Sequence, residues 1–167
     1  MGRSATNIIG VCGEHYVSAY LSGWGLIVAL PRGGNPGTDL FVASASGGPG
    51  IRIQVKTGTD SYHSIKKEAE PHYRWPTTYS VIDQSDKSLW FAYVWLRHWP
   101  KGEEQPEVFF VPAAFVAERM RTVREEKRDK PNAWTFFWMW RSEAEKYKGR
   151  QGLGILLDTI NSEAQNA

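Results

Sequence analysis

The stretch Ile51-Arg-Ile-Gln-Val-Lys-Thr57 decides the fold of this chain, together with Gly37-Thr-Asp39 upstream of it. Side chains in the longer stretch alternate between aliphatic and polar, which is the pattern of a half-buried β-strand. Gln54 and Lys56 point to the polar face of that strand. Asp39 stands at the start of the preceding strand and can reach the same place if the two strands pair. The pattern therefore predicts a carboxylate, an amide and an ammonium group side by side.

These groups suit a metal ion. A carboxylate oxygen, an amide oxygen and a strand carbonyl are hard ligands for Mg²⁺. Asp39, the side chain of Gln54 and the carbonyl of Val55 supply one of each, and Lys56 adds a mobile positive charge beside them. The alternative interpretation is an edge strand with a solvated polar face, because half-buried strands commonly carry polar residues at every second position.

A helix expected over residues 6–21 adds a second carboxylate. Ser4 or Thr6 is a plausible N-cap, and the helix should end at the break Ser22-Gly23. Glu14 shares its face of this helix with three aliphatic side chains, Val11, Val17 and Leu21. A carboxylate on a mostly apolar face is costly to bury unless it is paired or lies near a metal. We therefore expect Glu14 to be paired or to lie near a metal.

The order of these elements, a helix with Glu14, a strand, the Asp39 strand and the Gln54-x-Lys56 strand, resembles the PD-(D/E)XK nuclease superfamily in its restriction-endonuclease-like and Holliday-junction-resolvase-like branches. The resemblance covers residues 8–57 well. It implies an α/β, restriction-endonuclease-like fold with an αβββαβ core, in which helices flank a mixed central sheet.

Residue by residue, the resemblance implies that Asp39 is the metal-binding aspartate, Lys56 the catalytic lysine and Glu14 the first-helix glutamate. Gln54 stands where the superfamily most often has an acid, so the site has one formal charge fewer; some branches carry glutamine there. The proline in the superfamily's name is absent, since Pro36 lies three residues before Asp39.

The resemblance implies a metal-dependent endonuclease that hydrolyses phosphodiester bonds of DNA, with Mg²⁺ as cofactor and Mn²⁺ as a substitute. DNA is then the expected partner, and a homodimer is a further expectation because many nucleases of this fold dimerise. The alternative is a catalytically inactive module that keeps the fold and binds nucleic acid or a protein partner. The complete set of Glu14, Asp39 and Lys56 favours the enzyme, whereas fold alone would not.

Length and composition agree with this interpretation. The 167 residues are the length of one ordinary domain, expected to span 1–167. A net charge of +2 does not by itself indicate a polyanionic partner. Basic residues are interspersed with acidic ones between Arg119 and Lys130. This stretch is either a solvated helix face or a contact with phosphate groups. Cys12 is the only cysteine and is expected in the core; without a disulfide framework or an apolar run long enough to cross a membrane, we expect a cytoplasmic protein.

Aromatic residues suggest where nucleic acid could bind. Residues 134–140 hold five aromatic rings, which form either a base-stacking platform or core packing under the sheet, and the unbroken run favours core packing. Tyr62, His63, Arg74 and Trp75 mix rings with cations and are better candidates for nucleic-acid contact, although a loop packed on the sheet edge explains them nearly as well. The four histidines and Cys12 lack the spacing of a zinc site.

The remaining pattern predicts further elements. We expect strands at residues 24–30, 40–45, 89–96 and 108–111, a short helix around 64–69, and a helix that begins with Pro112 at its first position.

Overall fold

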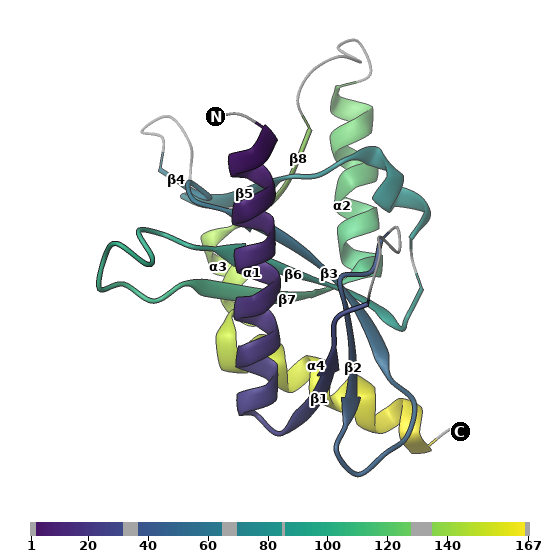
Figure 1. The fold of residues 1–167 in the computed structure, drawn as a ribbon. Coiled ribbons are helices and arrows are strands. Elements are labelled where there is room, and N and C mark those ends of the chain that lie inside the picture. Colours follow the sequence, from purple (N-terminus) through teal and green to yellow (C-terminus); the bar gives the residue numbers. More distant parts are fainter. Residues whose placement is uncertain (1–2, 32–36, 65–69, 85, 128–134, 166–167) are drawn as a thin grey trace.

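A mixed five-stranded sheet forms the centre of the computed structural model, which describes residues 3–31, 37–64, 70–84, 86–127 and 135–165 (Figure 1). The strand order is β1-β2-β3-β6-β7; β3 and β6 run parallel, and the other neighbours are antiparallel. The bounds are β1 Leu26–Ala29, β2 Leu40–Ser44, β3 Ile51–Gly58, β6 Leu89–Trp95 and β7 Glu107–Pro112.

A second, smaller sheet has the order β4-β5-β8, with both pairs antiparallel. Its strands are β4 Tyr62–His63, β5 His72–Pro76 and β8 Phe136–Trp140. The 3₁₀-helix η1, Tyr79–Asp83, leads from β5 towards β6. The short helix α3, Arg141–Ala144, and the 3₁₀-helix η2, Glu145–Tyr147, follow β8.

Two long helices, α1 (Arg3–Gly23) and α4 (Gly149–Gln165), pack on one face of the central sheet (Figure 1). The other face is covered by α2 (Ala113–Glu126) and by the smaller sheet. The core is therefore divided into two clusters by the central sheet, one aliphatic under α1 and α4 and one rich in aromatic rings between the two sheets.

The alternation of aliphatic and polar side chains along β3 is confirmed, and it determines which face of the strand turns towards α1. Ile51, Ile53 and Val55 are buried in the aliphatic cluster under α1, while the residues between them are only partly buried. Strand β6 is apolar almost throughout because both of its faces are buried: Trp90, Ala92 and Val94 face one cluster, and their neighbours face the other.

The fold class expected from the sequence is confirmed, with differences in detail. Between β3 and β6 the described residues form the β4–β5 hairpin and η1, and no α-helix, so the helix in the expected αβββαβ order is not seen there. Most of the short helix expected at 64–69 lies outside the described residues. Pro112 is the N-cap of α2 and not its first residue, with φ −60° and ψ 140°.

The first helix also differs from expectation. Because α1 begins at Arg3, neither Ser4 nor Thr6 is its N-cap. Val11 is 49% exposed, so the face around Glu14 is less apolar than its sequence spacing suggested. Cys12 is only partly buried at the edge of the aliphatic cluster, where burial raises the pKa of its thiol. Among the described helices, none has the length and apolar character needed to cross a membrane.

Candidate active site

Asp39 is fixed beside the free edge of β3, directly before β2 begins. Its backbone N–H donates to the carbonyl of Ile53 at 2.9 Å, and its carboxylate Oδ2 accepts the N–H of Val55 at 2.7 Å. Strand β3 continues past the point where β2 starts, so the Asp39 side chain takes the place of the missing strand neighbour. The second carboxylate oxygen has no hydrogen-bond partner among the described residues.

The turn before Asp39 depends on Gly37, whose φ of +83° is unfavourable for residues with a side chain. Thr38 follows and is buried, which holds the backbone against the core as it enters β2. A Cβ at Gly37 would lie 3.5 Å from the amide nitrogen of Gln84, so the turn also packs closely against the end of η1.

Lys56 lies two residues after Gln54 on β3, opposite Tyr93 of β6. Burial lowers the pKa of its ammonium group, and the nearby Asp39 carboxylate partly offsets that effect. Lys56 forms no hydrogen bond or ion pair with any residue in the described ranges. Its charge is therefore close to Asp39 but not neutralised by a direct contact.

Gln54 carries a buried polar atom with no partner. Its side-chain Oε1 accepts no hydrogen bond within the described part of the chain. A buried carbonyl oxygen without a donor is unfavourable, and such a group calls for a physical explanation. One explanation is that this oxygen binds a cation or a hydrogen-bond donor that belongs to a ligand.

Glu14 reaches this region because α1 crosses β3 at close range. A Cβ at Gly13 would overlap the hydroxyl of Thr57, so only glycine permits this approach. Burial and the charge of Asp39 raise the pKa of the Glu14 carboxyl group, and His15 opposes this shift. The two carboxylates therefore lie close enough to repel each other.

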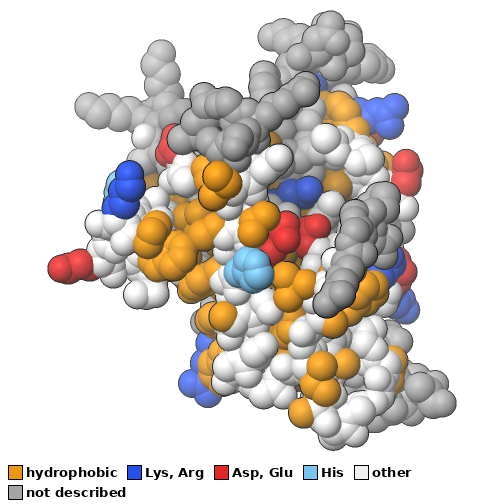
Figure 2. Space-filling view, in the orientation of Figure 1, with side chains coloured by type: hydrophobic (Ala, Val, Ile, Leu, Met, Phe, Trp, Pro, Cys, Tyr) orange, Lys and Arg blue, Asp and Glu red, His pale blue; other side chains and the backbone are white. Residues whose placement is uncertain are grey.

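The structure thus brings Glu14, Asp39 and Lys56 together next to Gln54. Figure 2 shows acidic side chains gathered beside α1 with a basic side chain next to them. No three histidine, cysteine, aspartate or glutamate side chains of the described residues converge as a metal site. Any ion bound here would depend on the two carboxylates, the Gln54 amide and the backbone.

The expected nucleic-acid contacts divide between two faces of the smaller sheet. Trp75 is fully buried and donates its indole N–H to the carbonyl of Val94 at 3.0 Å, so its assignment as a nucleic-acid contact is wrong. Tyr62 stacks on Trp95 with ring centroids 5.6 Å apart, facing the central sheet. His63 and Arg74 lie on the outer face.

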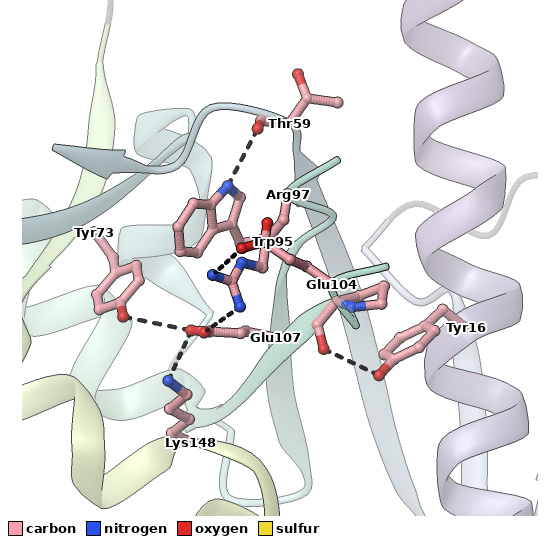
Figure 3. A network of polar contacts seen from close by, with 9 residues as sticks. Tyr16, Thr59, Tyr73, Trp95, Arg97, Glu104, Glu107 and Lys148 are labelled. Carbon is pink, nitrogen blue, oxygen red and sulfur yellow. Dashed lines mark hydrogen bonds and ion pairs between the residues drawn. The ribbon is translucent and has the colours of Figure 1, made fainter. Parts of the chain in front are cut away.

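A second polar cluster was not predicted from the sequence. The Glu107 carboxylate lies 2.8 Å from the Lys148 Nζ and 3.5 Å from an Arg97 guanidinium nitrogen, and it accepts the Tyr73 hydroxyl at 3.4 Å (Figure 3). Arg97 also pairs with Glu104 at 3.0 Å. Because these charges neutralise one another, the cluster joins β5, β7 and the start of α4 and is not an anion site. Tyr73 and Lys148 lie far in the sequence from Arg97, Glu104 and Glu107, so no local pattern indicates the whole cluster.

The basic stretch after Arg119 makes internal contacts in its described part. Arg119 pairs with Glu143 at 2.7 Å, and a guanidinium nitrogen of Arg121 donates to the carbonyl of Ile82 at 3.1 Å. Arg119 is partly buried, but Arg121 and its charged neighbours on α2 are exposed, as the solvated helix face predicts, and the phosphate contact stays a prediction. Arg128 and Lys130 lie outside the described residues.

The similarity of this chain to known proteins lies in its structure and not in its sequence. No protein-family model and no curated protein matches the chain. The solved structure of the bacterial homing endonuclease I-Ssp6803I is similar over 100% of both chains, with a TM-score of 0.58 and 11% sequence identity. The chain has a restriction-endonuclease-like fold. At this identity the likeness establishes the fold, and the activity must be argued from the site.

Proposed function

We propose that the protein is a metal-dependent endonuclease that hydrolyses phosphodiester bonds of DNA, with Mg²⁺ as its ion and Mn²⁺ as a substitute. The observation that carries this proposal is the position of Asp39. Its carboxylate accepts a hydrogen bond from the Val55 N–H at the free edge of β3, near Lys56 and Gln54, and neither the Lys56 Nζ nor the Gln54 Oε1 has a partner among the residues that the structure describes. This arrangement occurs in a fold known from nucleases.

The side chains fit a hard divalent cation. Asp39 and Gln54 each have an oxygen without a partner in the described part of the chain, and the N–H of Val55 points to Asp39. In an extended residue the N–H and C=O point to the same edge of the strand, so the Val55 carbonyl faces the Asp39 side. Oxygen ligands of these three kinds suit Mg²⁺. A cation here would also offset the charge of Asp39, which adds to the effect of burial in raising the pKa of Glu14.

The chemistry divides among the residues. A bound Mg²⁺ would polarise a phosphate oxygen and lower the pKa of a bound water. Lys56 places its Nζ where it can contact a phosphate oxygen and neutralise charge that develops on it. In its neutral form, which burial favours by lowering its pKa, Lys56 would instead take the proton of the attacking water. Asp39 would hold the ion, and Glu14 would hold a second ion or a metal-bound water.

Cleavage of DNA by matched variants tests this proposal. Supercoiled, linear, branched and single-stranded DNA are incubated with Mg²⁺ or Mn²⁺. We expect Asp39→Ala to abolish metal-dependent cleavage and Lys56→Ala to reduce it severely while metal affinity is kept or raised, because the lysine repels the cation. Asp158→Ala, which removes an exposed carboxylate from α4, should cleave like the wild type.

A catalytically silent binding module is the second candidate, and the small number of carboxylates at the site favours it. Wild-type protein that is inactive on every substrate and binds no metal would establish this candidate and overturn the nuclease.

We also propose that residues 1–167 act as one domain and that the protein forms a homodimer. Ile27 and Phe41 are 58% and 40% exposed on the same face of β1 and β2, and a second copy would cover them. Sedimentation of the wild type and of Phe41→Ser tests this: the variant should be more monomeric, and a wild type that is monomeric at all concentrations would refute the dimer.

A further inference from the structure

The outer face of the β5–β8 pair carries a continuous set of rings and cations. Strands β5 and β8 alternate between buried and partly exposed residues, so their buried side chains enter the aromatic cluster and the others point outward. The register pairs His72 with Trp140, Arg74 with Trp138, and Pro76 with Phe136. His63 of β4 continues this face beside His72. We call these residues the outer aromatic face.

Rings on the outer aromatic face contact one another and are only partly buried, and Arg119 of α2 lies over one of them, Trp138. Trp138 and Trp140 have ring centroids 5.0 Å apart, and the rings of His63 and His72 are stacked at 5.6 Å. His72 also meets Trp140 edge to face at 5.9 Å. Each of these side chains keeps part of its surface exposed. Rings of this size on a flat sheet face expose π surface that a core would normally bury.

Cations lie directly over these rings. The Arg74 Cζ is 5.0 Å from the centroid of Phe136, and the Arg119 Cζ is 4.3 Å from that of Trp138. Arg74 donates its Nε–H to His63 at 2.9 Å, and Arg119 is paired with Glu143. No acid among the described residues pairs with Arg74, so the face keeps positive charge among its rings.

We propose that the outer aromatic face binds an unpaired strand of DNA, so that the substrate of the proposed nuclease contains single-stranded nucleotides. Bases stack on aromatic side chains and on guanidinium planes, and cations between the rings contact the phosphates. Paired bases inside a duplex do not offer their faces to such a surface. This inference rests on the proposed function in one respect: it takes the bound strand to be part of the substrate of the nuclease.

The position of the face agrees with this role. Strand β3, which carries Lys56, ends at Gly58, and β4 begins at Tyr62, so only three residues separate the strand of the candidate active site from the smaller sheet. The Gly58 backbone also packs against Trp75 of β5, whose neighbours Arg74 and Pro76 point outward. A strand held on the outer aromatic face can therefore continue to the candidate active site.

Binding of a labelled oligothymidylate to the full chain, with EDTA present to prevent cleavage, tests the inference by fluorescence anisotropy. Trp138→Ala and Arg74→Ala should each weaken binding roughly ten- to a hundredfold. Trp138→Phe, which keeps a ring, should retain most of the affinity. Trp24→Ala is the matched control, because Trp24 is 46% exposed and also lies under an arginine, Arg150, but is not part of this face. A blunt duplex should bind the wild type and Trp138→Ala equally.

Each outcome is decisive. The inference is overturned if Trp138→Ala and Trp138→Phe both bind oligothymidylate with the affinity of Trp24→Ala. It is also overturned if the wild type binds no single strand. An equal loss on single strands and duplex would also overturn it, because unpaired bases would then not be recognised. A further outcome separates the two proposals. If Trp138→Ala loses binding to oligothymidylate, Asp39→Ala keeps it and the wild type cleaves no DNA, the proposed nuclease activity is refuted and the proposed strand binding by the outer aromatic face stands.

Discussion

Gln54 is the residue at which this chain departs most from an acidic metal site, and its buried Oε1, which has no partner within the described ranges, makes it directly testable. Gln54→Glu should bind Mn²⁺ more tightly, on the order of tenfold, because an anionic oxygen binds a hard cation more strongly than an amide does. Isothermal titration calorimetry measures this. Gln151→Glu adds the same charge at an exposed position on α4 and should leave the affinity unchanged. Equal or weaker affinity in Gln54→Glu would mean that Gln54 is not a ligand.

Lys56 should reduce the stability of the folded protein at neutral pH. Its pKa is lowered in the fold, so between that value and the ordinary lysine pKa the unfolded chain binds more protons, and stability rises with pH across this window. Below the folded pKa the full cost of the buried charge applies. Lys56→Met should therefore melt at the wild-type temperature or a few degrees above it near pH 7.

Thermal melting of the two proteins over a pH series checks this expectation, and the difference between them should shrink as the pH approaches the ordinary lysine pKa. A Lys56→Met protein that is clearly less stable than the wild type at neutral pH would show that Lys56 serves the fold through a contact and is not held available for a ligand.

Among the elements, the crossing of α1 over β3 determines where Glu14 lies. Gly13→Ala should destabilise the protein by about 1–3 kcal/mol, because the added methyl group overlaps the side chain of Thr57. Gly10→Ala is the control on the same helix: nothing lies near its Cβ position, so it should be neutral or should stabilise by about 0.5–1 kcal/mol. Urea unfolding gives both values. Two variants of equal stability would show that α1 does not approach β3 so closely.

Local patterns predicted much of the fold. The alternation of β3, the apolar runs of β6 and β7 and the helical spacing of α2 follow from short-range sequence and are observed. Helix α4 was not predicted, although Leu153, Leu156 and Ile160 recur at helical spacing, because three glycines at its start favour a loop. The pairing of β5 with β8 joins segments about sixty residues apart, and no local pattern encodes it.

The candidate site was predictable to a different degree at each residue. Asp39, Gln54 and Lys56 stand on two neighbouring strands, so alternation and pairing bring them together. The Trp75 assignment failed because a ring next to a cation in sequence points to the opposite face of a strand, and here that face is the core. The same alternation divides residues 136–140, since Phe137 and Met139 are core and the rest are outward, so the expected core packing holds for only part of that run.

In the molecule as a whole, the two sheets and their helices leave one edge of β3 open where β2 begins, and the carboxylates and the lysine gather at that edge. The aliphatic cluster holds α1 on one face, and the aromatic cluster holds the smaller sheet on the other. The central claim is that this edge is a metal site that serves phosphodiester hydrolysis.

A crystal structure of the wild type soaked with Mn²⁺, with the ion located by its anomalous scattering, tests that claim most directly. The account predicts one ion bound by the Asp39 carboxylate, the Gln54 Oε1 and the Val55 carbonyl, with the Lys56 side chain next to it and no ion in Asp39→Ala crystals treated in the same way. An ion bound elsewhere in the molecule, or none at this edge at a saturating concentration of Mn²⁺, would contradict it.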